Sequence, residues 1–209
     1  MRPTTPRLTI ALLAALCLVV RAADDDFQPL IRGDDPNQFQ LVQIGPETIT
    51  IKDGVIRLSG KPNGYFATKD SYKNYVLQFE WMYERPEGLE SDEAFRGNSG
   101  LLVHIQPPHK VWPKSIELQL MNRQVGRNIP IGGAKLVGKW DQEAYKRAIK
   151  PVGEWNREEV TSKDGTLTCT LNGVEVTRGT GAEPSEGQIG WQSEGAPIRF
   201  RNLRIKVLD

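Results

Sequence analysis

The stretch that decides the fold is Ser115-Ile116-Glu117-Leu118-Gln119-Leu120, in which polar and apolar residues alternate strictly. Successive side chains of a β-strand point to opposite faces, so the three apolar residues face one way and Ser115, Glu117 and Gln119 the other. A carboxylate and a carboxamide on one face of a strand can contact a single ligand. We therefore predict a strand here whose polar face belongs to the functional site.

A second alternating stretch, Gly100-Leu101-Leu102-Val103-His104-Ile105, lies just upstream. Strand alternation places Leu101, Val103 and Ile105 on the apolar face and His104 on the opposite one. If the two strands are neighbours in one sheet, His104, Glu117 and Gln119 share a surface. We predict these three residues as the catalytic group, although His104 and Glu117 could also be solvated side chains of surface strands.

The strand expected over 75–83 has the same pattern, and its alternation points Glu80 away from the apolar face. Glu80 fits either a site residue or an ion pair with a neighbouring basic side chain. Trp155 and Trp191 are expected in the core. Cys169 is in phase with apolar neighbours, which predicts a buried small residue rather than a nucleophile.

Turn signals separate about ten short strands, and helical periodicity is almost absent. Asp53-Gly54 and Asn172-Gly173 suit type I′ hairpin turns, and the slip of the apolar phase at Arg201-Asn202 suggests a β-bulge. Glycine and proline interrupt 122–153, which we expect to be a loop walling the site, with at most a short helix over 141–148. The pattern predicts an all-β sandwich of two antiparallel sheets, with jelly-roll rather than simple meander winding.

The first residues have the features of a secretory signal peptide. Arg2 and Arg7 precede an apolar run over 8–20, which is too short to span a bilayer comfortably, and a small-residue cleavage site follows it. We expect residues 1–22 to be removed, leaving one domain over 23–209 in an exported, periplasmic or secreted protein. An uncleaved anchor is the alternative. We otherwise expect membrane contact only during export.

Charge excludes one class of partner. The chain has 27 basic and 26 acidic residues and no basic tract, and loss of the signal peptide removes Arg2, Arg7 and Arg21. Proteins that bind nucleic acid present a basic patch to the phosphates, so nucleic acid is not an expected partner. Only Cys169 remains after Cys17 leaves, so the domain cannot form an internal disulfide.

Ten short motifs, in order along the chain, resemble the 3-keto-disaccharide hydrolase domain family. The resemblance runs from about Phe27 to Leu208. The motifs are Gly64-Tyr65, Thr68-Lys69, Leu77-x-Phe79-Glu80-Trp81, Asn98-Ser99-Gly100 with His104, Trp112-Pro113, Ile116-Glu117-x-Gln119, Gly153-Glu154-Trp155-Asn156, Leu171-Asn172-Gly173, Gln192-Ser193-Glu194-Gly195-Ala196-Pro197 and Ile198-x-Phe200-Arg201-Asn202.

The resemblance implies a concanavalin A-like jelly roll that acts on 3-keto-glycosides, which are carbohydrates already oxidised at C3. Relatives often carry Gly-Asp-Ile after the Glu117 strand, whereas this chain has Gly126-Arg127-Asn128-Ile129. If that acidic residue contacts the ligand or a metal ion in relatives, this departure implies a different substrate preference or activity for this chain. We expect substrate contacts from Glu80, Lys69, Asn98, Trp112, Gln192 and Glu194.

Several of these residues also have plain structural interpretations. Lys69 fits a solvated lysine, Glu194 a turn cap, and Trp112 either a platform for sugar stacking or a core residue. His109 lies between a diproline and Lys110 and fits an ordinary loop residue. A divalent metal ion is a possible cofactor, with His104, Glu117 and Glu80 as candidate ligands, although no dense spacing motif demands one.

Two functions from different classes fit these observations. The first is an exported enzyme that cleaves 3-keto-glycosides by base-catalysed elimination across C1–C2, followed by addition of water. The second is a non-catalytic carbohydrate-binding module on the same fold. The titratable residues favour the enzyme, because a binding module needs aromatic and amide side chains rather than a histidine with carboxylates.

Overall fold

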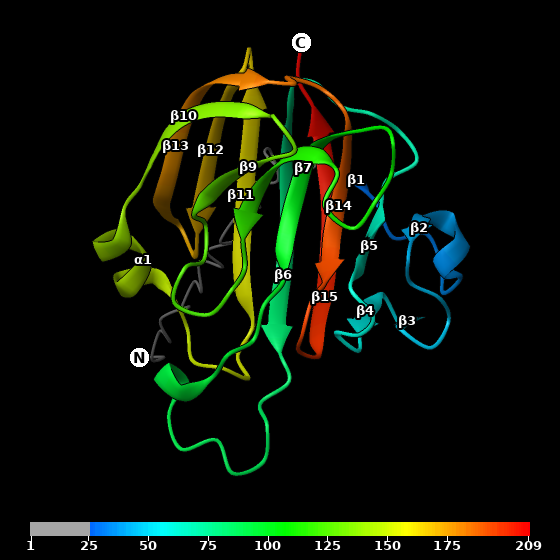
Figure 1. Ribbon diagram of the computed structural model, residues 1–209, viewed down its shortest axis with the longest axis vertical. Coiled ribbons are helices and arrows are strands. Elements are labelled where there is room, and N and C mark those ends of the chain that lie inside the picture. The colour runs from blue at the N-terminus through cyan, green and yellow to red at the C-terminus, as the bar shows by residue number, and fades with distance from the viewer. Residues whose placement is uncertain (1–25) are drawn as a thin grey trace, which may run out of the picture.

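The computed structural model describes residues 26–209, which form two antiparallel sheets packed face to face (Figure 1). The predicted signal peptide, residues 1–22, lies outside the described residues. Within 26–209, no helix is long and apolar enough to cross a membrane. The predicted all-β sandwich is therefore confirmed for this part of the chain.

The larger sheet has nine strands in the described range. Its order is β10-β13-β12-β11-β6-β15-β4-β3, and β1 pairs with β15 off this path. The strands are β1 (Gln28–Pro29), β3 (Ile49–Lys52), β4 (Val55–Leu58), β6 (Tyr75–Tyr83), β10 (Lys135–Trp140), β11 (Asn156–Lys163), β12 (Thr166–Leu171), β13 (Val174–Glu183) and β15 (Ile198–Val207).

The smaller sheet, again within the described part of the chain, has six strands in the order β2-β5-β14-β7-β8-β9. They are β2 (Gln40–Val42), β5 (Gly64–Ala67), β7 (Gly100–Gln106), β8 (Lys114–Gln119), β9 (Asn128–Ile131) and β14 (Gln188–Ser193). Strands far apart in sequence, such as β14 and β5, lie side by side, so the winding is not a simple meander.

The turn predictions follow from residues that tolerate a left-handed backbone. Asp53 and Gly54 have φ values of 51° and 74° between β3 and β4, and Asn172 and Gly173 have 48° and 87° between β12 and β13. Positive φ at both central residues is the type I′ geometry that matches strand twist. The predicted bulge in β15 is also present, because its register against β6 shifts between Arg201 and Arg204.

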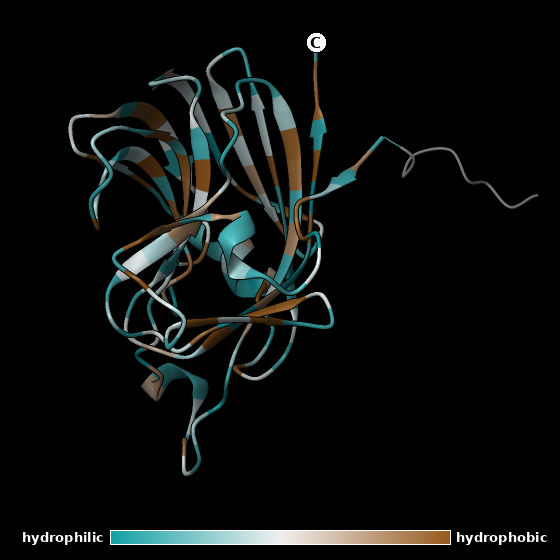
Figure 2. Ribbon diagram, turned by 90° about the vertical axis from the view of Figure 1, so that its right-hand side faces the viewer, coloured by the Kyte–Doolittle hydropathy of each residue, from teal (hydrophilic) through white to brown (hydrophobic). Residues whose placement is uncertain are grey.

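The core lies between the two sheets, and aromatic rings from both sheets meet in it. Phe66 of β5 stacks on Trp191 of β14 at 5.1 Å, and Phe79 of β6 meets Trp191 edge-on at 6.0 Å. Polar and apolar residues alternate along the strands around this core (Figure 2). Trp191 and Cys169 are fully buried as predicted, whereas the prediction for Trp155 is wrong, because this ring is only half-buried and lines a surface groove.

The segment 122–153 contains more regular structure than its glycines predict. It forms β9, which extends the smaller sheet beside β8, and β10, which extends the larger sheet beside β13. The predicted short helix is α1 (Gln142–Ala148), capped by the Asp141 carboxylate, which accepts from the backbone N–H groups of Glu143 and Ala144. Two 3₁₀ turns, η1 (Pro36–Gln38) and η2 (Asp92–Ala94), complete the described elements.

Candidate active site on the outer face of the smaller sheet

The prediction that Glu117 and Gln119 leave the core side of their strand is confirmed. Ile116 and Leu118 of β8 lie in the core between the sheets, so Glu117 and Gln119 lie on the outer face of the smaller sheet. In the pairing of β7 with β8, Gly100 lies opposite Gln119 and Leu102 opposite Glu117. The two strands are therefore neighbours, as expected.

Gly100 provides the space in which two site side chains meet. A Cβ atom at this position would overlap both Glu117 Oε1 and Gln192 Oε1. The two oxygens therefore converge over the Cα atom of Gly100, and only glycine leaves room for them. The glycine of the Asn98-Ser99-Gly100 sequence, which opens β7, is thus explained by packing in the site as well as by a turn.

Glu117 is a buried carboxyl group with an unusual protonation equilibrium. Its residue is 6% exposed, and burial, aided by the negative charge of Glu194, raises its pKa to about 7. Glu117 Oε1 and Gln192 Oε1 are both buried acceptors without a hydrogen-bond partner among the described residues. Two facing acceptors are satisfied when the carboxyl group is protonated and donates to the amide oxygen. The geometry thus agrees with the raised pKa.

Glu194 and Asn98 complete this group of side chains. Burial raises the pKa of Glu194, and a hydrogen bond from the Asn98 side chain acts in the opposite direction. Asn98 also forms backbone bridges with Glu194 and Gly195, and its Oδ1 atom is buried and unpaired within the described structure. We call Glu117, Gln192, Glu194 and Asn98 the Glu117 cluster. It offers two acids and two amides for binding sugar hydroxyl groups and for proton transfer.

Gln119 lies on the predicted face, but its carbonyl group is already engaged. Gln119 Oε1 accepts from the backbone N–H of Met121 at 2.8 Å, which fixes the turn after β8. The amide NH₂ group remains as the donor that Gln119 can offer a ligand. Arg127, in the loop after β8, directs its guanidinium to Gln124, and its backbone carbonyl accepts from the backbone N–H of Gln119.

The predicted placement of His104 beside Glu117 is wrong. The register of β7 against β8 shifts after Val103, and His104 has a φ of 58°. This bulge inserts one residue and reverses the alternation, so Ile105 joins the apolar residues of the outer face while His104 turns between the sheets. There its ring nitrogens contact Ser162 Oγ at 3.1 Å and the carbonyl oxygen of Pro184 at 2.9 Å. Burial lowers the pKa of His104 to about 4.

Glu80 also lies away from the Glu117 cluster. It projects from the outer face of the larger sheet, where its carboxylate accepts from Arg201 Nε at 2.7 Å and from Asn202 Nδ2 at 2.9 Å. His104, Glu117 and Glu80 therefore point into three different regions and do not form a metal site. Within residues 26–209, no group of three or more His, Cys, Asp and Glu side chains is placed to hold a metal ion.

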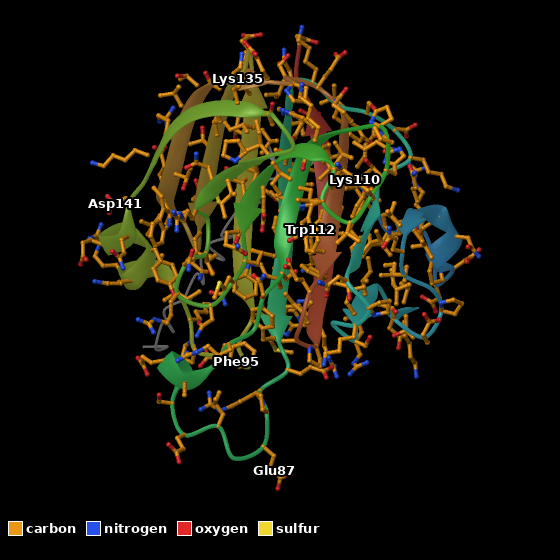
Figure 3. The ribbon with its side chains drawn as sticks, viewed as in Figure 1. Glu87, Phe95, Lys110, Trp112, Lys135 and Asp141 are labelled. Atoms are coloured by element: carbon orange, nitrogen blue, oxygen red, sulfur yellow. The ribbon has the colours of Figure 1, made fainter. Side chains whose placement is uncertain are left out.

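Lys69 and Trp112 lie around the smaller sheet rather than inside the Glu117 cluster. Lys69 is exposed, and its carbonyl accepts from Gln188, at the opposite end of β14 from the cluster. Trp112 is 47% exposed in the loop between β7 and β8 (Figure 3). An exposed indole on a loop beside this face fits the predicted stacking platform rather than a core residue.

Two further residues of this face were not predicted from the sequence. Tyr65 of β5 lies opposite Gln192 in the pairing of β5 with β14. Its hydroxyl group is 3.3 Å from Nδ1 of His109, which belongs to the same loop as Trp112. Burial raises the pKa of Tyr65 to about 12, so it remains a neutral phenol. The only indication that the sequence gives for Tyr65 is its position in a strand. That position becomes informative only once the strand that pairs with β5 is known.

Comparison with known proteins identifies the family. A model of the 3-keto-alpha-glucoside-1,2-lyase-like domain matches residues 26–206, so the chain belongs to this family of carbohydrate-active proteins. One relative is a 3-keto-disaccharide hydrolase of Bacteroides thetaiotaomicron, 23% identical over an alignment that covers 78% of this chain and 71% of that protein. The predicted family is therefore confirmed.

Solved structures show the same fold. A Parabacteroides distasonis ATCC 8503 protein, provisionally named a glycosyl hydrolase, superimposes with a TM-score of 0.66 and 22% identity, covering 88% of this chain and 95% of its own. The carbohydrate-binding module CBM66 from Bacillus subtilis gives a TM-score of 0.54 at 12% identity, covering 81% and 95%. The concanavalin A-like jelly roll predicted from the sequence is confirmed.

Proposed function

We propose that this protein is an exported enzyme that cleaves 3-keto-glycosides by elimination and hydration, with Glu117 as the base. One observation carries the proposal: a buried carboxyl group whose pKa is raised to about 7 sits among amide side chains, beside an apolar cluster on the same sheet face. A general base works best when its pKa lies near the working pH. Membership of the family and the name of the Bacteroides relative support the substrate class.

The chemistry needs few groups because the ketone at C3 acidifies the proton on C2. The Glu117 carboxylate takes this proton, the C–H electron pair forms the C1–C2 double bond, and the C1–O bond breaks as the aglycon leaves with its electron pair. A proton from solvent or a side chain completes the alcohol product. Water then adds to C1 of the enone, and a proton returns to C2. The net reaction is hydrolysis without an oxocarbenium ion, unlike the reaction of ordinary glycosidases.

The other residues have roles that follow from their positions. The negative charge of Glu194 helps to hold the pKa of Glu117 near neutrality. The free NH₂ group of Gln119 is a donor for the ketone oxygen, on which negative charge develops during proton removal. Asn98 Oδ1 and Gln192 Oε1 are acceptors for sugar hydroxyl groups. His109 and Trp112 belong to the loop beside the face and are candidates to contact the aglycon.

The test is to incubate the protein with 4-nitrophenyl 3-keto-glucoside in D₂O. We expect release of nitrophenol together with 3-ketoglucose that carries more deuterium at C2 than 3-ketoglucose acquires in D₂O without protein, because the proton removed from C2 exchanges with solvent before it returns. Release without deuterium at C2 would contradict elimination and indicate direct displacement at C1. The same measurement on the unoxidised glucoside is the control, and we expect no release because its C2 proton is not acidic.

The likeness to CBM66 supports a second candidate, a non-catalytic carbohydrate-binding module. This candidate predicts that the protein binds the 3-keto-glucoside without releasing nitrophenol. Calorimetric binding combined with an absence of product over hours would favour the module over the enzyme. The raised pKa of Glu117 then would have no catalytic use, since binding requires no proton transfer.

A further inference from the structure

A groove crosses the outer face of the larger sheet, on the opposite side of the molecule from the Glu117 cluster. A hollow of about 850 Å³ adjoins a second of about 350 Å³, and Glu80 and Arg157 line both. Each hollow by itself lies within the range of volumes of pockets that hold small molecules. The larger hollow is lined by Glu80, Lys150, Trp155, Arg157, Glu159, Thr170, Asn172, Gly173 and Arg201.

The acidic groups of this groove already accept hydrogen bonds from donors of the protein. Burial opposes ionisation of Glu80, but the hydrogen bonds from Asn202 and Arg201, with the positive charges of Arg201 and Arg157, outweigh it and lower its pKa, so Glu80 is an anion at neutral pH. Glu159 accepts from Gln78 Nε2 at 2.6 Å. Neither carboxylate therefore needs a ligand cation.

Two basic groups of the groove, in contrast, have donors to spare. Arg157 is exposed and lies directly across from Glu80 in the β-ladder, where its charge helps to lower the pKa of Glu80. Its guanidinium nevertheless makes no side-chain hydrogen bond or close ion pair among the described residues, so its N–H donors are available. Lys150 Nζ donates to the carbonyl oxygen of Trp155 at 3.1 Å and retains two further N–H donors. The groove thus presents a guanidinium and an ammonium group suited to an anionic oxygen group.

An aromatic ring lies beside these donors and is held in place by a third cation. The Arg201 guanidinium carbon stands 4.0 Å from the centroid of the Trp155 ring, and the same guanidinium is fixed by Glu80. This double attachment orients the indole, which is half-buried at the edge of the groove. The Thr170 hydroxyl group and the Trp155 edge add contacts that suit a pyranose ring rather than a bare inorganic anion.

We propose that this groove binds an acidic saccharide, with its carboxylate or sulfate on Arg157 and Lys150 and a sugar ring against Trp155. The interruption of the basic groups by Glu80 and Glu159 disfavours a long polyanion such as nucleic acid, which needs an unbroken basic path. This second site is separate from the Glu117 cluster and does not depend on the activity proposed for it. It would attach the protein to an acidic glycan while the opposite face acts.

The test is isothermal titration calorimetry of the protein with trigalacturonate, a sulfated carrageenan oligosaccharide and neutral maltotriose. We expect binding of at least one acidic oligosaccharide, weakened as salt rises from about 50 to about 500 mM, and much weaker binding of maltotriose. The two acidic arms distinguish a carboxylate from a sulfate ligand. Equally tight binding of maltotriose, or no binding of either acidic saccharide, would overturn the proposal.

Variants locate the binding on this groove. Arg157→Gln and Lys150→Gln should each raise the Kd about tenfold or more, because each removes a charge-assisted hydrogen bond. Arg178→Gln is the matched control, since Arg178 is an exposed arginine of the same sheet that pairs with Glu175 outside the groove. Glu117→Gln should also leave this Kd unchanged. Loss of affinity in Arg178→Gln equal to that in Arg157→Gln would show diffuse charge attraction and contradict a defined site.

Discussion

Glu117 and Glu80 occupy equivalent positions in the sequence pattern, yet their environments are opposite. Each stands between two large apolar residues of an alternating strand, and each points out of the sandwich. Burial raises the pKa of Glu117 to about 7. The pKa of Glu80 is lowered, because its hydrogen bonds and ion pair with Asn202 and Arg201 outweigh the opposing effect of burial. Glu117 is therefore suited to proton transfer, and Glu80 is suited to forming ion pairs with arginine side chains.

Cross-strand neighbours explain the difference. Glu80 lies opposite Arg157 of β11 and Arg201 of β15, so two cations flank it. Glu117 lies opposite Leu102 of β7 and Ile129 of β9, so its immediate neighbours across both strands are apolar. The alternation of a strand therefore predicts the face on which a carboxyl group lies, whereas the residues of the paired strands influence its pKa.

The comparison predicts the largest effect for removal of the two carboxyl groups in turn. Glu117→Gln should lower kcat/KM on a 3-keto-glucoside by roughly 100-fold or more, because general-base catalysis contributes on this scale. Glu80→Gln, the matched control, should change it by less than about threefold, on the order of a surface ion pair's contribution, since Glu80 lies on the larger sheet, away from the Glu117 cluster. Similar losses in both variants would mean that the site is misassigned.

A third carboxyl group, Glu158, extends the comparison to the interior of the sandwich. It is fully buried between the sheets, accepts from Trp81 Nε1 at 3.0 Å and contacts Cys169, and burial raises its pKa to about 8. The unfolded carboxyl group ionises near its ordinary value of 4.5, so between pH 4.5 and 8 the unfolded state binds fewer protons than the native one. Stability contributed by this group is therefore lost as the pH rises through that window.

Glu158→Gln tests this account through urea unfolding at mildly acidic and mildly alkaline pH. The glutamine cannot ionise and keeps an acceptor for Trp81. We expect its stability relative to the wild type to increase toward alkaline pH, by on the order of 3 kcal/mol. Equal pH dependence of the two proteins would show that Glu158 is ionised in the native state.

The space over Gly100 gives the next largest effect. In Gly100→Ala the new methyl group would displace the ends of Glu117 and Gln192, which are flexible, so the fold should survive. We expect turnover to fall about tenfold or more, because a displaced base loses its alignment with the C2 proton. Circular dichroism and urea unfolding serve as the structural control. Full activity in a variant that folds normally would show that this contact does not position the base.

The smallest effect concerns the charge of Glu194. In Glu194→Gln the pKa of Glu117 should fall, because a nearby negative charge that opposes its ionisation is removed. The activity of the base requires the ionised form, so the rising limb of kcat/KM against pH should move to lower pH by a fraction of a unit. Glu80→Gln should leave this limb in place. If kcat/KM rises at the same pH in Glu194→Gln as in the wild type, the charge of Glu194 does not affect the pKa of Glu117, which would contradict this account.

Much of the fold could be predicted from local sequence. Asp53-Gly54 and Asn172-Gly173 determine their hairpin turns because few residues accept positive φ. The alternation around Glu117 determines its face, and the phase slip at Arg201-Asn202 reveals its bulge because the apolar residues on either side are out of register. In each case the chemistry that sets the structure lies within a few residues of the feature.

The rest depended on contacts between distant strands. The bulge at His104 cannot be recognised in the sequence pattern. The residues on both sides of it are apolar, and both faces of the smaller sheet bear apolar residues, so a change of face leaves no mark in the sequence. The strands that pair with β6, which are β11 and β15, determine the environment of the Glu80 carboxyl group. This pairing follows from the topology of the whole chain. His109 becomes a candidate site residue only because its loop folds back to Tyr65, which is 44 residues away in sequence.

The most direct test of the central claim is a ¹³C NMR titration of the protein labelled at the glutamate side-chain carboxyl carbons. Glu117→Gln and Glu80→Gln serve to assign the two resonances. We expect the Glu117 resonance to titrate with a midpoint near 7 and the Glu80 resonance to titrate below the ordinary glutamate value of 4.5. A Glu117 resonance that titrates at or below 4.5 would contradict the account, whatever the activity of the protein proves to be.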